Sequence, residues 1–149
     1  NISLTNAEKE FLEISDLDDM DGQNFFNLDM KGVEFAFALN FYGTLLPSKI
    51  FSKGMVKKGK GAIINISSMN AFTPLTKIPA YSAAKSSVSN FTSWLAVHFS
   101  KVGVRVNAIA PGFFMTEQLR FLHIDQQTGE YTPRAQKVIA HTVLEPRSC

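Results

Sequence analysis

The sequence has 149 residues, of which 45% are hydrophobic and 19% charged, as in an ordinary domain that buries a core. Its net charge of +2 is too small to indicate a nucleic-acid or anionic-membrane partner. The single cysteine, Cys149, excludes an intramolecular disulfide and a cysteine metal cluster, so we expect a reducing, cytoplasmic location. No apolar run approaches the roughly 18 residues of a membrane span, so we expect no membrane partner.

The first part of the chain predicts a loop followed by an interrupted helix. Residues 1–30 are acidic and irregular, and we interpret them as a surface loop. Asp29 is a candidate N-cap for the helix that follows. From Lys31 to Lys57 apolar residues recur mostly at helical intervals, but Gly43 and Pro47 predict an irregularity in the middle.

Two short apolar segments with a helix between them predict parallel strands. Residues 61–67 (GAIINIS) and 104–112 (VRVNAIAPG) have the pattern of parallel strands that are buried on both faces. Between them, residues 80–101 predict a helix, which Gly103 ends. A strand, helix and strand with a crossover of this length form a right-handed βαβ unit. The fold class predicted from these residues is therefore α/β with a parallel sheet.

The stretch that joins the first strand to this helix carries the candidate chemistry. Ser68, Tyr81 and Lys85 stand in the spacing S-x12-Y-x3-K. Residues four apart on a helix share one face, so the lysine ammonium can lie near the phenol. A phenol with a pKa of about 10 is a poor acid or base at neutral pH, and a nearby positive charge favours its phenolate. With a serine hydroxyl from the strand end, these residues predict a proton-transfer site for an alcohol or a carbonyl.

Over roughly residues 30–120 the sequence resembles the short-chain dehydrogenase/reductase family. The matching elements, in the family's order, are Asn40 of N-x-x-G, Ser68, the Y-x-x-x-K of Tyr81 and Lys85, and the P-G-x-x-x-T of Pro111, Gly112 and Thr116. The resemblance implies a three-layer, Rossmann-type parallel sheet. The family's glycine-rich pyrophosphate turn, its second-strand residue and its NNAG segment are absent, so the chain looks like the C-terminal portion only.

The resemblance also implies an NAD(P)(H)-dependent oxidoreductase that interconverts a ketone and a secondary alcohol. Tyr81 would exchange the proton with the substrate oxygen, and Lys85 would support the phenolate and hold the nicotinamide ribose. Ser68 would polarise the substrate oxygen, and Asn40 would hold a water that links the lysine to solvent. The candidate cofactor contacts are Tyr81, Lys85, Pro111, Gly112 and Thr116, and the candidate substrate contacts are Ser68, Asn70, Phe113 and Phe114. The histidines show no ligand spacing, so no metal site is expected.

A narrower resemblance, to the bacterial D-mannonate oxidoreductases (fructuronate reductases) of the short-chain type, lies in residues 64–85, 91–114 and 140–142. It implies D-fructuronate and D-mannonate as the substrate pair, and it favours NADH over NADPH. Family members are usually dimers or tetramers, so a homo-oligomer that packs through the predicted helices is expected.

The resulting interpretation is a single partial domain over residues 1–149. It consists of the loop 1–30, a catalytic βαβ region over 31–112, and a substrate lid with an altered or truncated end over 113–149. Two alternatives stay open: a non-catalytic remnant or scaffold that retains the motif, and an enzyme of the same family that acts on another sugar or hydroxy acid.

Overall fold

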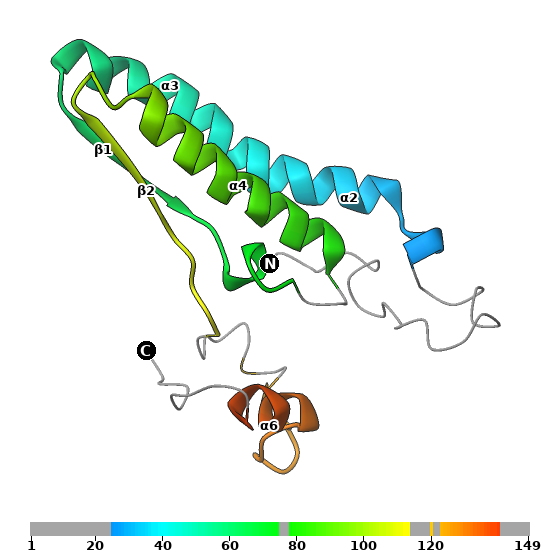
Figure 1. Cartoon of the computed structure of the whole chain (residues 1–149). Coiled ribbons are helices and arrows are strands. Elements are labelled where there is room, and N and C mark those ends of the chain that lie inside the picture. The colour runs from blue at the N-terminus through cyan, green and yellow to red at the C-terminus, as the bar shows by residue number, and fades with distance from the viewer. Residues whose placement is uncertain (1–24, 75–77, 114–119, 121–122, 141–149) are drawn as a thin grey trace. The chain divides into compact units, whose positions relative to one another are not determined.

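The computed structural model describes residues 25–74, 78–113, 120 and 123–140 (Figure 1). The chain forms two compact units, Asn1–Ala110 and Pro111–Cys149. Most of the loop predicted over 1–30 lies outside the described residues. The elements in chain order are η1 (Phe25–Asn27), α2 (Met30–Phe37), η2 (Ala38–Tyr42), α3 (Gly43–Lys58), β1 (Gly61–Ile66), η3 (Met69–Ala71), α4 (Pro79–His98), β2 (Val104–Ile109) and α6 (Pro133–Ala140).

The helical segment before β1 starts at a cap and contains a π-helical turn. The Asp29 side chain accepts a hydrogen bond of 3.0 Å from the Lys31 N–H and caps α2, as predicted. The predicted irregularity is confirmed, because the π turn η2 separates α2 from α3. It lies before Pro47, which instead sits inside α3 and removes one backbone donor there.

The strands β1 and β2 confirm the α/β fold with a parallel sheet. They pair in parallel, with Gly61 opposite Val104 and Ile66 opposite Ile109. The helix α4 connects them, and Gly103, at a φ of 71°, makes the turn into β2. Figure 1 shows α2, α3 and α4 on the same side of the two strands, and α4 contacts both strands as well as α2.

A small core lies between the sheet and α4. Residues 61, 63 and 65 of β1 and their partners in β2 point toward the helix layer, because side chains alternate along a strand. The buried apolar residues of this layer are Ala84, Val88 and Leu95 of α4, Ala36 of α2, and Val104 and Val106 of β2.

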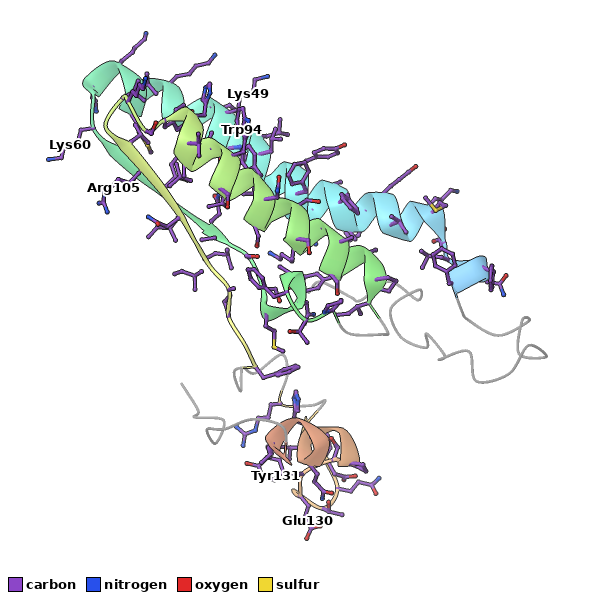
Figure 2. All side chains as sticks on the ribbon, in the orientation of Figure 1. Lys49, Lys60, Trp94, Arg105, Glu130 and Tyr131 are labelled. Carbon is purple, nitrogen blue, oxygen red and sulfur yellow. The ribbon has the colours of Figure 1, made fainter. Side chains whose placement is uncertain are left out.

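No described element of the first unit covers the other face of the sheet. Ile64, Ile66 and Ile109 point there and are 62%, 53% and 53% exposed. Figure 2 shows that Lys60 and Arg105 also project on the side away from the helices. The sequence predicted burial on both faces, and this differs from the structure because all described helices of the first unit lie on one side. An apolar strand pattern indicates suitability for burial and cannot supply the layer that buries it.

The second unit contains a short hairpin and α6. An antiparallel bridge joins Ile124 to Tyr131, and Gly129, at a φ of 74°, lies in the turn between them. The sequence pattern indicates weak helical stretches around 116–123 and 133–141; the second is present as α6, and most of the first lies outside the described residues.

Candidate active site

The candidate serine stands where the chain leaves β1. Ser68 keeps an extended backbone (φ −160°, ψ 157°), and its buried Oγ accepts a hydrogen bond of 3.2 Å from the Asn70 N–H. The serine therefore caps the short turn η3. This contact uses one lone pair and leaves the O–H proton for another acceptor. Asn70 itself is buried beside it.

The candidate tyrosine and lysine lie in the first two turns of α4. Pro79 occupies the first position of that helix, where a missing N–H costs little. The Lys85 Nζ lies 5.8 Å from the centroid of the Tyr81 ring, so the predicted proximity of ammonium and phenol is confirmed. The same Nζ donates a hydrogen bond of 2.9 Å to the Ile66 carbonyl oxygen at the end of β1. Burial lowers the pKa of Lys85 below its usual value of 10.5.

The π turn positions the candidate asparagine. The Asn40 amide donates a hydrogen bond of 2.9 Å to the Ala36 carbonyl, and the Asn40 carbonyl accepts one of 3.0 Å from the Thr44 hydroxyl. A cavity of about 420 Å³ between α3 and β1 is lined by both Asn40 and Lys85. The structure thus brings the asparagine and the lysine, forty-five residues apart, to one cavity.

Two serines that sequence reasoning missed connect these elements. The Ser67 Oγ lies 3.2 Å from the Lys85 carbonyl oxygen and 2.6 Å from the Ser89 Oγ. A detectable signal was the position of Ser89 four residues after Lys85, on the same helix face. No spacing in the sequence distinguishes Ser67, which stands beside the motif residue Ser68.

The remaining candidates are not all placed with this group. Pro111, Gly112 and Phe113 belong to the second unit, where the Phe113 ring meets His123 edge-on with centroids 6.5 Å apart. Phe114 and Thr116 lie outside the described residues. The first unit therefore assembles the candidate catalytic residues, and the proposed contacts in 111–116 stay predictions.

Two other classes of site find no support in the described part of the chain. No cluster of three or more histidine, cysteine, aspartate or glutamate side chains could hold a metal ion there. None of the helices described is both long enough and apolar enough to cross a membrane.

The chain is similar to known proteins in its sequence. A sequence profile described as short chain dehydrogenase matches residues 19–127. An uncharacterized oxidoreductase of Haemophilus influenzae is 58% identical over 122 residues, which are 82% of this chain and 42% of the relative.

Two solved structures share the fold as well as part of the sequence. One, from Haemophilus, is a proposed D-mannonate oxidoreductase with bound NAD; it is 54% identical, with a TM-score of 0.78 over 93% of this chain and 48% of that one. The other, a proposed NAD(P)-dependent gluconate 5-dehydrogenase of Beutenbergia cavernae with bound NADP, is 29% identical, with a TM-score of 0.68 over 77% of this chain and 44% of that one. The chain therefore spans less than half of the length of these relatives.

Proposed function

Because the chain belongs to the short-chain dehydrogenase family, we propose that it carries the catalytic residues of an NAD(P)(H)-dependent oxidoreductase for a ketone and a secondary alcohol. The fold is α/β and Rossmann-type, as in the structures it resembles. The observation that carries the proposal is the position of the Lys85 ammonium, 5.8 Å from the Tyr81 ring and bound to the strand end that precedes Ser68.

Tyr81 is the proposed acid and base. In reduction its hydroxyl donates a proton to the ketone oxygen, and in oxidation the phenolate accepts the proton of the alcohol. The Lys85 ammonium stabilises the phenolate electrostatically, and its anchor at the Ile66 carbonyl holds the charge in place. Positioned acid–base catalysis of this kind accelerates a reaction by about 10²–10⁴-fold.

Ser68 and Asn40 support the transfer from two sides. The O–H proton that Ser68 keeps available can be donated to the substrate oxygen and polarise it. Asn40 lines the same cavity as Lys85, so a water held there would connect the ammonium to solvent. This arrangement would return a proton to the site after each reduction and release one after each oxidation.

The residues present fit the ribose end of a nicotinamide cofactor. The half-buried ammonium of Lys85 and the phenol of Tyr81 are adjacent donors that suit a pair of ribose hydroxyls. We propose further contacts from Pro111, Gly112 and Thr116. When bound, the nicotinamide would supply the hydride in reduction and accept it in oxidation. NAD is favoured by the Haemophilus structure, although the Beutenbergia structure holds NADP.

The proposed substrate pair is D-fructuronate and D-mannonate. Its support is the name of the Haemophilus structure, together with the sequence resemblance around residues 64–85. Asn70, Phe113 and Phe114 are the proposed substrate contacts, and residues 113–149 the proposed lid. The gluconate dehydrogenase relative makes other sugar acids the alternative substrates to test.

We also propose self-association through the outer face of α4. Trp94 is 57% exposed, and its ring stacks between those of Phe91 and His98, at centroid distances of 6.2 Å and 4.8 Å. No acidic or basic side chain other than His98 lies between Lys85 and Lys101. In light scattering after gel filtration, Trp94→Glu should lower the mass of the particle, and Ser93→Glu, one position around the helix, should not. Equal masses for all three proteins would refute this interface.

The activity is tested with the purified chain. NADH binding is measured by fluorescence titration, and D-mannonate oxidation with NAD by the absorbance of NADH, beside D-gluconate as the competing sugar acid. Tyr81→Phe should reduce turnover by about 100-fold or more while NADH binding persists. The matched control is Tyr42→Phe, which removes a tyrosine hydroxyl from the exposed π turn and should leave turnover unchanged. Full turnover by Tyr81→Phe would refute the mechanism.

A further inference from the structure

We infer that Ser67 and Ser89 are positioning residues for Lys85. Their hydroxyls hold the turn of α4 that carries the lysine against the end of β1, where Ser68 begins the next turn. The inference deepens the proposed function, and it rests on that function only in taking Lys85 as the group that acts on the Tyr81 phenol.

The direction of the hydrogen bonds follows from the chemistry of the three groups. The Lys85 carbonyl oxygen can only accept, so the Ser67 hydroxyl, 3.2 Å away, donates its single proton to it. The Ser89 Oγ lies 2.6 Å from the Ser67 Oγ and must then be the donor of that bond. The three groups form one directed chain, from Ser89 through Ser67 to the Lys85 carbonyl.

Consecutive residues at the end of β1 therefore hold Lys85 at both of its ends. The Ile66 carbonyl accepts from the ammonium at 2.9 Å, and the Ser67 hydroxyl donates to the main-chain carbonyl of the lysine. The Ser67 N–H in turn donates to the Ile109 carbonyl of β2 at 2.8 Å. Because Ser67 is only 3% exposed, water cannot readily replace its hydroxyl. The ammonium is thereby fixed relative to both strands.

A second buried contact between the same two elements provides a matched control. The Asn65 amide donates a hydrogen bond of 2.8 Å to the Thr92 hydroxyl. Thr92 follows Lys85 by about two helical turns, so this contact joins β1 to α4 without touching the lysine. Its loss should loosen the packing of strand and helix and leave the position of the ammonium unchanged.

The test measures the protonation of Lys85 directly, by competitive acetylation with a trace of acetic anhydride across a pH series and mass spectrometry of the peptide that contains it. The full chain is compared with Ser67→Ala, Ser67→Thr and Thr92→Val. In Ser67→Ala we expect the labelling midpoint of Lys85 to move by about half a pH unit or more toward that of the exposed lysines, because the ammonium gains water. Ser67→Thr keeps a hydroxyl and should retain the original midpoint. Thr92→Val should lower the stability of the protein without moving the labelling midpoint of Lys85.

Two results would overturn the inference: an unchanged midpoint in Ser67→Ala, or an equal movement in Thr92→Val, which would indicate general loosening. If Ser67→Ala does not fold, Ser89→Ala, which removes only one donor at a half-buried site, carries the test with a smaller movement in the same direction. Labelling needs no turnover. Failure to oxidise D-mannonate would therefore count against the proposed function and leave this result standing.

Discussion

The hydrogen bond between Asn65 and Thr92 gives a prediction whose size can be worked from the structure. Both residues are buried, and the Thr92 hydroxyl accepts from Asn65 at 2.8 Å while it donates to the Val88 carbonyl at 2.8 Å. Thr92→Val keeps the shape of the side chain but leaves the Asn65 N–H without its partner. A lost hydrogen bond together with a buried, unpaired donor should cost about 2–3 kcal/mol of unfolding free energy.

Substitution of the other partner, Asn65, should lower the unfolding free energy by less than Thr92→Val does. In Asn65→Leu the Thr92 hydroxyl still donates to the Val88 carbonyl, so we expect a loss of about 1 kcal/mol. The double variant removes both partners, and its cost should fall about 1–2 kcal/mol below the sum of the single costs. Urea unfolding followed by far-ultraviolet circular dichroism measures all four proteins, with unchanged m values as the control for two-state behaviour. Strict additivity of the two costs would refute the reasoning.

The remaining predictions concern a turn and a charge. Gly103→Ala should cost about 2–4 kcal/mol, because the added Cβ would overlap the Gly59 carbonyl at a positive φ, whereas Gly59→Ala meets no neighbour and should cost about 1 kcal/mol; equal costs in thermal melts would contradict the overlap. Burial lowers the pKa of Lys85, so the unfolded chain binds more protons than the folded chain between that lowered pKa and 10.5. Lys85 should therefore make stability rise with pH in this window, and Lys85→Met should remove the rise, as urea unfolding at a series of pH values would show.

The sequence predicted the elements that local residues determine. The cap at Asp29, the interruption near Gly43, the two strands and the helix between them are all present, because capping, periodicity and turn residues act over a few positions. The proximity of Tyr81 and Lys85 was predictable for the same reason, since a spacing of four on a helix fixes it.

Contacts that depend on packing could not be predicted in this way. The Ser67 hydroxyl meets Ser89 across twenty-two residues of chain, and nothing in the spacing of two serines distinguishes a buried contact from two surface hydroxyls. The burial predicted for Ile64 depended on a layer that local sequence does not describe. Both features depend on which helix packs against which face of the sheet, and this is a property of the assembled structure.

The π turn at residues 38–42 has a consequence for the length of this segment. A π turn contains one residue more than an α turn, and each residue turns an α-helix by about 100°. Because the π turn takes up this extra residue in a wider turn, α2 and α3 stay in phase, and deletion of one residue there should give an unbroken helix whose buried face is unchanged. If the same five residues instead formed an ordinary α-helix, α3 would turn by about a further 100°; Ser48 and Ser52, its buried residues, would leave the protein-facing side, and exposed ones such as Ile50 would turn toward it. The π turn therefore keeps the buried face of α3 aligned with that of α2, although the segment between them holds one residue more than an α-helix would.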